Sequence, residues 1–217
     1  MSAISRTVLR EQVKDILLHR IVSGELKSGE RLVETRIAGE LGTSQAPVRE
    51  ALRDLELLRL VESEPFRGAR VREFGDEELI EVYPVRAALE ELAAREAAAR
   101  LAGNVTVLER EVEAMLAAAK RDDVNALARH DIAFHRLMVE AAGNLILEQC
   151  WKTLGVEGRI TISLYGTYVE PMQAAELHVP IVEAIRSGKP GAAGRAARKH
   201  VEHFARIARN RAKAAAH

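Results

Sequence analysis

The fold of the first domain is decided by residues 30–71, ERLVETRIAGELGTSQAPVREALRDLELLRLVESEPFRGARV. A short helix is expected over residues 34–41, and Gly42 then provides the left-handed turn that lets the chain reverse direction. Ser44 suits the N-cap of a following helix, and Pro47 is tolerated in its first turn because that N–H has no intrahelical partner. A helix, a glycine turn and a capped helix form a helix-turn-helix, whose second helix places its N-terminal residues in the major groove of DNA.

The segments on either side complete a winged helix. An amphipathic helix is expected before the motif, because apolar residues there follow helical spacing up to the stop at Gly24. These residues are Leu9, Val13, Ile16, Leu17 and Ile21. After the motif, short β-type runs at residues 60–64 and 69–72 flank a Pro-Phe-Arg-Gly turn. A basic hairpin tip can reach the sugar-phosphate backbone or the minor groove, and the neighbouring helix-turn-helix favours this wing over an ordinary exposed hairpin.

The rest of the chain predicts a separate helical domain. Residues 76–142 are rich in helix formers, and Gly, Asn or Asp residues break the later pattern into about six helices. We therefore expect a mainly α protein of 217 residues: a winged helix-turn-helix DNA-binding domain over residues 1–73 and an all-α bundle over residues 74–217. The basic end, residues 195–217, is interpreted as a solvated helix face in preference to a second nucleic-acid contact.

The charges of the chain add up to zero but are not evenly divided. There are 32 Lys and Arg residues and 32 Asp and Glu residues, whereas residues 1–72 carry 13 basic and 11 acidic side chains. Bulk charge is therefore too small to drive DNA binding, and DNA affinity must depend on a few placed cations, Arg49 and Arg67 above all.

Several chemistry-bearing residues in the second domain could form a metal site. Asp131 and His135 are four residues apart, so on one helix they project from the same face. Two further histidines, His178 and His200, stand on later predicted helices. Three imidazoles and one carboxylate suit zinc, nickel, manganese or iron better than calcium or magnesium. The residues alone still favour a surface polar pair over a metal site.

The sequence resembles the GntR family of bacterial transcription regulators, in the FadR-like subgroup that carries an FCD ligand-binding domain. The resemblance rests on residues 30–71, especially PVREAL followed by the glycine of the wing. It implies that the second helix of the motif faces DNA through Ser44, Gln45, Ala46, Pro47 and Arg49. It also implies that Thr35 or Arg36, at the start of the first helix of the motif, lies near phosphate, and that Arg67 and Gly68 form the wing tip.

Two positions depart from the family pattern. Gln45 stands where members often carry arginine, and Arg59-Leu60 replaces a common acidic or polar residue followed by glycine. Since arginine prefers guanine and glutamine prefers adenine, the first departure implies a different operator sequence. The second changes the junction between the motif and the wing.

The FCD resemblance also implies ligands in the second domain. Asp131, His135, His178 and His200 match the metal-binding positions of the family, with zinc as the first expectation and nickel, manganese or iron as alternatives; His203 is the alternative to His200. Arg86 matches an arginine that faces the effector cavity, and its alternative is an ion pair with Glu90. Asn144 is primarily a turn residue and secondarily a cavity-lining amide.

Together these features predict a homodimeric, ligand-responsive transcription regulator, acting as a repressor on a near-palindromic operator in double-stranded DNA. A small-molecule effector, an organic acid, is expected to bind at the metal. The alternative is a metal-dependent hydrolytic enzyme that uses the Asp/His cluster, but no general base or phosphate loop accompanies the cluster, so no enzyme is expected.

The sequence further predicts a cytoplasmic protein without a membrane partner. No stretch approaches the ~18 consecutive apolar residues of a membrane span, and the N-terminus lacks the apolar core of a signal peptide. Cys150 is the sole cysteine, which excludes an internal disulfide, and a packed thiol is expected in its apolar helical stretch.

Overall fold

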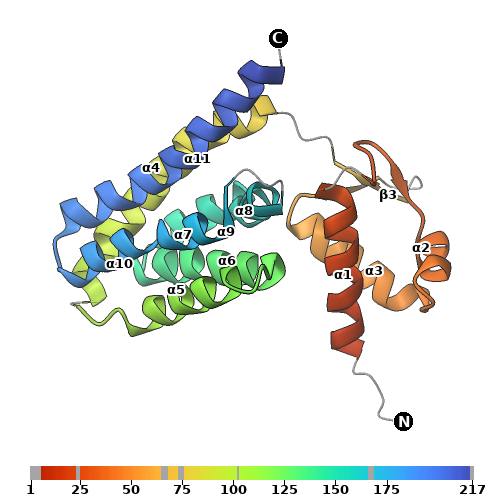
Figure 1. The fold of residues 1–217 in the computed structure, drawn as a ribbon, viewed down its shortest axis with the longest axis horizontal. Helices are drawn as coiled ribbons and strands as arrows, with labels where there is room; N and C mark the ends of the chain where they lie inside the picture. Colours follow the sequence, from red (N-terminus) through yellow and green to blue (C-terminus); the bar gives the residue numbers. More distant parts are fainter. Residues whose placement is uncertain are drawn as a thin grey trace. The chain divides into compact units, whose positions relative to one another are not determined.

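The computed structural model describes residues 6–22, 25–64, 68–72, 76–101, 103–165 and 169–215. The chain divides into two compact units, Met1–Phe74 and Gly75–His217 (Figure 1). The first holds three helices around a small sheet and the second is helical throughout its described part. The expected mainly α architecture, a winged helix-turn-helix followed by a helical bundle, is confirmed.

The first unit has the elements of a winged helix. Its helices are α1 (Arg6–Val22), α2 (Glu34–Glu40) and α3 (Gln45–Leu57), and its strands are β1 (Arg31–Leu32), β2 (Val61–Glu64) and β3 (Gly68–Val71). The strands form an antiparallel sheet in the order β1-β3-β2. Strand β1 was not expected, because two residues are too few to show an alternating pattern.

The core of this unit lies where α1 packs against α3. Leu17, Val48 and Leu55 are completely buried between the two helices. The expected inward face of α1 was wrong at one position, because Ile16 is 40% exposed and Leu18 is buried in its place. Spacing alone could not separate these neighbours, since both flank the same apolar stripe.

A tight turn joins α3 to the wing without the glycine that is usual there. The N–H of Leu60 donates to the carbonyl of Leu55, and the N–H of Arg59 donates to that of Glu56. These two bonds form a Schellman helix end, which needs a left-handed residue, and Arg59 supplies it with φ of +56°. The side chain of Leu60 is completely buried, so this departure from the family pattern retains the helix end and adds an apolar anchor.

The second unit is built from α4 to α11. The bounds of these helices are α4 Asp76–Leu101, α5 Thr106–Ala119, α6 Val124–Ala141, α7 Leu145–Thr153, α8 Val156–Tyr165, α9 Pro171–Glu176, α10 Val179–Arg186 and α11 Pro190–Ala215. The breaks after α7 and α9 were not expected. The long helices α4 and α11 lie side by side (Figure 1), and α5 pairs with α6.

Small residues let α4 and α11 approach closely. Ala94 and Ala97 of α4 and Ala193 and Ala197 of α11 are all completely buried. An added Cβ at Gly194 would lie only 2.6 Å from the Cγ atom of Arg95, so that position has no room for a side chain. Close packing of these two helices brings the inward face of α11 into the middle of the bundle.

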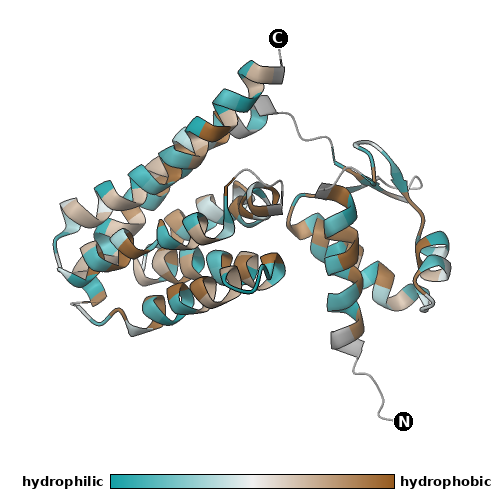
Figure 2. Ribbon diagram, in the orientation of Figure 1, coloured by the Kyte–Doolittle hydropathy of each residue, from teal (hydrophilic) through white to brown (hydrophobic). Residues whose placement is uncertain are grey.

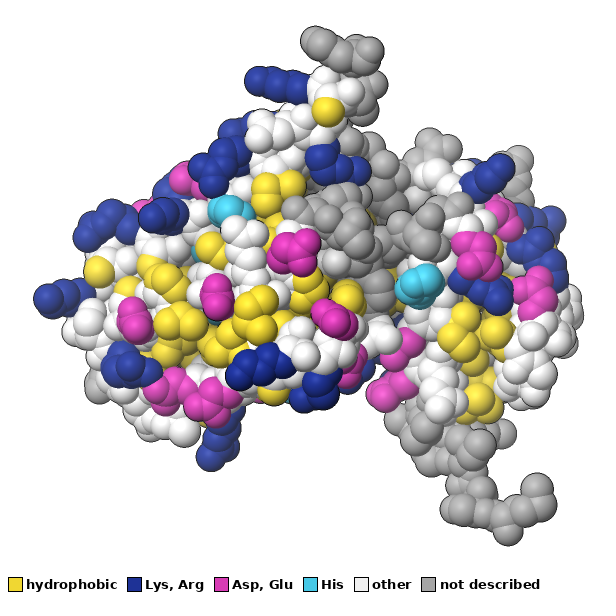
Figure 3. Space-filling model, in the orientation of Figure 1, with side chains coloured by type: hydrophobic (Ala, Val, Ile, Leu, Met, Phe, Trp, Pro, Cys, Tyr) yellow, Lys and Arg dark blue, Asp and Glu magenta, His cyan; other side chains and the backbone are white. Residues whose placement is uncertain are grey.

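The surface of the second unit is mixed. Hydrophobic and hydrophilic residues occur around each helix (Figure 2), and the hydrophobic side chains visible in Figure 3 are bordered by charged ones. Cys150 is exposed, so the expected packed thiol was wrong; the buried face of α7 is formed instead by Leu147 and Trp151. Within the described residues, no helix combines the length and the apolar character needed to span a membrane.

Candidate functional site

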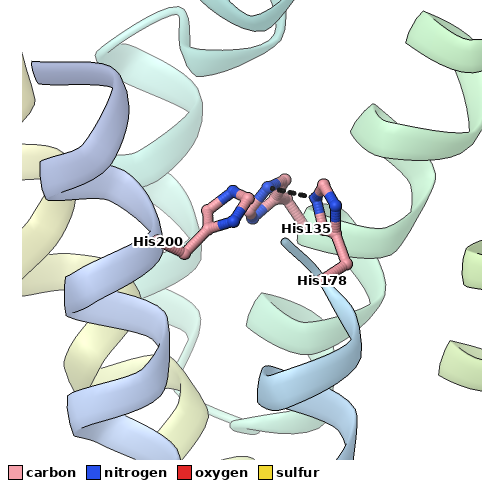
Figure 4. A group of neighbouring side chains, drawn as sticks. All are labelled: His135, His178 and His200. Carbon is pink, nitrogen blue, oxygen red and sulfur yellow. Dashed lines mark hydrogen bonds between the residues drawn. The ribbon is translucent and has the colours of Figure 1, made fainter. Parts of the chain in front are cut away.

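Three histidines converge inside the second unit. His135 lies on α6, His178 immediately precedes α10, and His200 lies on α11; their rings point toward one another (Figure 4). His135 and His178 are completely buried and His200 is 4% exposed. One ring nitrogen from each lies within 4.8 Å of the others, which is compatible with a common ligand.

The hydrogen-bonding partners indicate which ring nitrogens carry no proton. Nδ1 of His178 lies 3.0 Å from the carbonyl oxygen of Ala174, which can only accept, so Nδ1 carries the proton. Nε2 of His135 lies 3.3 Å from a guanidinium nitrogen of Arg86, which can only donate, so this Nε2 is an acceptor. The two Nε2 atoms are 3.3 Å apart (dashed line in Figure 4), and neither has a proton to give the other.

That separation suits a shared metal ion. Two nitrogens bound to zinc at 2.0–2.1 Å with a tetrahedral angle are about 3.3–3.4 Å apart. Burial lowers the pKa of His178 to about 4 and holds that of His200 well below its ordinary range, so both rings are neutral as metal ligands require. The Nδ1 atom of His200 is buried and has no hydrogen-bond partner in the described part of the chain.

A carboxylate lies beside two of the three histidines. Oδ1 of Asp131 lies 3.5 Å from Nε2 of His135, and Oδ2 lies 3.5 Å from Nε2 of His178. Burial raises the pKa of Asp131 to about 6, although His135 and Arg86 act in the opposite direction. Lone pairs of a carboxylate and two imidazoles therefore point into one buried space, an arrangement that a divalent cation stabilises.

A second buried carboxylate supports the site from behind. Glu90 is completely buried and accepts hydrogen bonds from Nε of Arg86 at 2.7 Å and from Nε1 of Trp151 at 3.1 Å. Its other oxygen lies 3.0 Å from Nδ1 of His135, although the two groups are not aligned as a hydrogen bond. Burial by itself raises the pKa of Glu90. The opposite effect of Arg86 and His135 is larger, so the pKa lies below its ordinary value and the carboxyl group is ionised. A carboxylate behind a metal-binding imidazole orients the ring and increases its basicity.

Sequence reasoning identified Glu90 only as a partner of Arg86. The two alternatives for Arg86 prove compatible, since it forms the ion pair and also lines a small cavity. The lone tryptophan, Trp151, was the one sign in the sequence that a buried acceptor such as Glu90 is needed, because a buried indole N–H requires a hydrogen-bond acceptor.

Removing the Glu90 carboxylate should destabilise the second unit strongly. Glu90→Ala leaves the Arg86 guanidinium buried without its counter-charge, which is expected to lower the free energy of unfolding by about 3–5 kcal/mol. Urea denaturation of the metal-free protein, followed by the fluorescence of Trp151, measures it. The matched control is Glu91→Ala, which removes a partly exposed ion pair with Arg198 and should cost less than about 1 kcal/mol. Equal effects of the two variants would contradict the buried-pair interpretation.

A small cavity adjoins the histidines. Its volume is about 10 Å³, which is room for one water molecule. The lining is polar on one side and apolar on the other, and it consists of Arg86, Asp131, Ile160, Ser163, Leu164, His200 and Phe204.

Two predicted residues lie elsewhere. Asn144 is exposed and caps α7, accepting a hydrogen bond from the N–H of Leu147, so its expected secondary role in lining the cavity is not supported. The side-chain oxygen of Asn144 is engaged as the helix cap, because it lies next to a backbone N–H that has no partner within the helix. His203 is partly exposed and bonded to Arg206, and the residue that joins the cluster is His200.

The predicted DNA-contacting residues mostly share the start of α3. Ser44, Gln45 and Ala46 are exposed, as are Thr35 and Arg36 on α2.

Pro47 differs from its neighbours, because it is buried and can position α3 but cannot touch a base. At the wing, Gly68 is exposed with φ of +80°, and Arg67 lies outside the described residues.

The arginines of this surface are paired with carboxylates. Arg49 is half exposed and forms a two-pronged contact with Glu34 at 2.7–3.1 Å. Arg36 lies 3.1 Å from Glu30. Because these pairs are solvent-exposed they are weak, and a phosphate or a guanine can replace the carboxylate at little cost.

Comparison with known proteins gives the family. The family model for bacterial regulatory proteins of the gntR family matches residues 9–71, and that for the FCD domain matches residues 81–203. A probable D-xylose utilization operon transcriptional repressor of Paenarthrobacter nicotinovorans is 38% identical over 201 residues, which cover 93% of this chain and 89% of the relative. The gluconate operon transcriptional repressor of Bacillus licheniformis is 30% identical over 152 residues, 70% of this chain and 62% of the relative.

A solved structure supports the same fold. The structure of Escherichia coli McbR/YncC superposes with a TM-score of 0.68 at 23% sequence identity, covering 94% of this chain and 98% of that one. These relatives are transcription regulators, so the hydrolytic alternative is not supported and the chain is not an enzyme. The chain belongs to the gntR family of bacterial regulatory proteins, as a DNA-binding transcription regulator with a C-terminal FCD domain.

Proposed function

We propose that this regulator is a homodimeric repressor whose DNA affinity is set by a small carboxylate bound beside a divalent transition metal. The observation that carries the proposal is the convergence of three buried imidazoles beside a small cavity, which is lined by His200, Asp131 and Arg86. A regulator active on chromosomal DNA works in the bacterial cytoplasm.

The metal would be held by His135, His178, His200 and Asp131. Three nitrogens and one oxygen favour zinc, with nickel, manganese or iron as alternatives. When bound, the metal supplies a Lewis-acidic position for a carboxylate oxygen of the effector. The chain itself supplies Arg86, whose guanidinium can donate to the second oxygen of the same carboxylate.

The effector must displace part of the cavity wall, because the cavity of about 10 Å³ is smaller than any organic acid. Helix α8 contributes Ile160, Ser163 and Leu164 to this wall, and we assign the displacement to α8. Arg159 of the same helix forms an ion pair with Glu78, in the first turn of α4, where the second unit begins. A shift of α8 would thus be transmitted to the first turn of α4. A ligand alters DNA affinity only through its different affinities for the two arrangements.

A thermal-shift screen of small carboxylates tests the effector proposal. The names of relatives mention D-xylose and gluconate operons, so sugar acids belong in the set together with simple hydroxy acids. At 100 times its dissociation constant, a true effector should stabilise the metal-loaded protein by about 2.7 kcal/mol. Uncharged analogues of the same size should not, and stabilisation by them alone would exclude a carboxylate site.

Two DNA-binding units, one from each subunit, would bind the operator together. Each subunit of a dimer would place α3 in the major groove of one half of a near-palindromic operator, with Arg49 and Gln45 at the bases and Arg36 near phosphate. The wing tip, with Gly68 and Arg67, would contact the backbone or the minor groove.

Exposed apolar residues mark the proposed dimer surface. Leu92 of α4 is 40% exposed, and Leu145 and Ile146 of α7 are 73% and 68% exposed. Helices α4 and α7 pack against each other, so these side chains belong to neighbouring elements. A group of exposed apolar side chains on neighbouring elements is typical of a surface that another chain covers, whereas a single exposed apolar side chain is common.

Negative charges introduced on this surface by substitution should separate the subunits. Leu145→Asp combined with Ile146→Asp is expected to weaken dimerisation by at least about 2 kcal/mol, which corresponds to roughly 30-fold in the dissociation constant. Sedimentation equilibrium measures the change. Leu57→Asp, at an 81% exposed leucine on α3, is the matched control and should leave the oligomeric state unchanged. An unchanged dimer in the double variant would place the interface elsewhere.

A further inference from the structure

A groove on the second unit is lined along one side by basic residues. It runs between α4, the junction of α9 and α10, and α11, and its volume is about 630 Å³. This lies within the 300–1,000 Å³ that is typical of small-molecule sites. Its charged lining residues are Arg195, Arg198, Lys199, Glu202, Arg206 and Arg209, five cations and one anion.

The cations form a stripe along α11. Arg195, Lys199, Arg206 and Arg209 recur at intervals of three, four or seven residues, which places them on one face of a helix. From first to last the stripe extends over about 21 Å. It belongs to the basic end of the chain that the sequence favoured as a solvated face.

Little of this charge is neutralised. Arg198 is paired with Glu91 at 2.5 Å and with Glu202 at 3.4 Å. Among the described residues, no carboxylate pairs with Lys199, with Arg195 or with Arg209. An anion that enters the groove therefore meets cations that it does not have to detach from other partners.

The other side of the groove is apolar. Its lining residues there are Tyr83, Pro84 and Ala87 of α4, and Leu177 and Pro180 at the junction of α9 and α10. A ligand that matches both walls has an apolar body and a negatively charged group. A concave, partly apolar groove fits this chemistry better than the convex and uniformly charged backbone of a DNA duplex.

The groove is separate from the proposed metal and effector cavity. Helix α11 lies between them, with His200 and Phe204 lining the cavity and Lys199 and His203 lining the groove. One hydrogen bond connects the two: the hydroxyl of Tyr83, which lines the groove, donates to Ser163, which lines the cavity. An occupant of the groove would therefore contact a residue that holds the effector wall.

We infer that this groove binds a second ligand, an organic anion with an apolar body and a doubly charged group such as a phosphate ester. Guanidinium groups match phosphate oxygens in geometry, and the apolar wall accommodates the body of the ester. The inference does not depend on the metal, so its outcome is independent of the proposed effector site.

Displacement of a fluorescent anion tests the inference with the full-length protein. 8-Anilinonaphthalene-1-sulfonate is the reporter, and phenyl phosphate, phenol and inorganic phosphate are the competitors. Phenyl phosphate should displace the reporter at concentrations at least about tenfold lower than phenol or inorganic phosphate, because it alone satisfies both walls. Treatment with a chelator should not change this order, whereas dependence on metal would assign the binding to the other cavity and overturn the inference.

Charge variants locate the site. Arg195→Glu with Lys199→Glu should weaken phenyl phosphate binding at least about tenfold, since two attractive charges become repulsive. The matched control, Arg110→Glu with Lys120→Glu, makes the same change on exposed positions of α5 and near its end, and should alter binding less than about twofold. Arg195→Gln with Lys199→Gln removes the two charges without introducing negative ones, so it should weaken phenyl phosphate binding to a smaller extent. It is the milder variant, to be used if the Glu variant does not fold. Equal effects in the groove and control variants would overturn the inference, as would a groove variant that loses DNA affinity but retains phenyl phosphate binding.

Discussion

Arg49→Ala should lose at least about 30-fold in affinity for the specific operator while the protein stays folded and dimeric. A bidentate contact between an arginine and a guanine contributes about 1–3 kcal/mol of discrimination, and the proposed dimer carries two such arginines. The Arg49 side chain is half exposed at the start of α3 and is held in a fixed direction by Glu34. An operator selected by the wild-type protein from a random DNA library, labelled for fluorescence anisotropy, provides the measurement.

The control for this variant lies one turn further along the same helix. Arg53 is exposed on α3 and is expected to be too far from the helix start to reach a base edge. Arg53→Ala should lower affinity for all sequences to a similar, smaller extent, with a shallower salt dependence. Retention of full operator affinity and specificity by Arg49→Ala would remove α3 from its proposed role.

His135→Ala combined with His178→Ala should abolish metal binding. The variant loses two ligands whose Nε2 atoms stand 3.3 Å apart, so elemental analysis should find no bound transition metal where the wild type holds a stoichiometric amount. A metal present at 100 to 1,000 times its dissociation constant stabilises the folded state by about 2.7–4.1 kcal/mol. The melting temperature of the second unit should therefore drop by about 5–15 °C relative to the loaded wild type.

Two other histidine changes separate ligation from general effects. His203→Ala removes a partly exposed ring on α11, and His130→Ala removes a ring that is bonded to Glu111. Both variants should retain the metal. A double variant at His135 and His178 that still carries full metal would refute the site.

The features that the sequence predicted well are local. Gly42 and Pro47 specify a turn and a helix start through their own backbone preferences, so the helix-turn-helix could be located to within a residue or two. Ser44 occupies the expected N-cap position, although its side chain forms no capping hydrogen bond. Asp131 and His135 are related by one helix turn, which makes their shared face independent of the rest of the fold.

The features that the sequence missed depend on tertiary packing. Glu90 acquires its role from Trp151, 61 residues away, and nothing near Glu90 indicates that its helix face will be buried against α7. His200 and His203 are three residues apart and both suit one helix face, and only the packing of α11 on α4 determines which ring is enclosed. Cys150 and Ile16 were misjudged for the same reason, because an apolar neighbourhood in sequence does not decide which side of a helix meets the core.

The proposed regulation depends most on a link between the metal site with its adjoining cavity and the affinity for DNA. The most direct measurement is operator affinity by fluorescence anisotropy, with and without a carboxylate that stabilises the protein in the thermal-shift screen. We predict a change of about tenfold, which corresponds to a coupling free energy near 1.4 kcal/mol, in the metal-loaded wild type. In the chelated protein and in the His135→Ala and His178→Ala double variant, the carboxylate should have no effect although basal DNA binding persists. An undiminished response without metal would contradict the proposal that this cavity controls DNA binding.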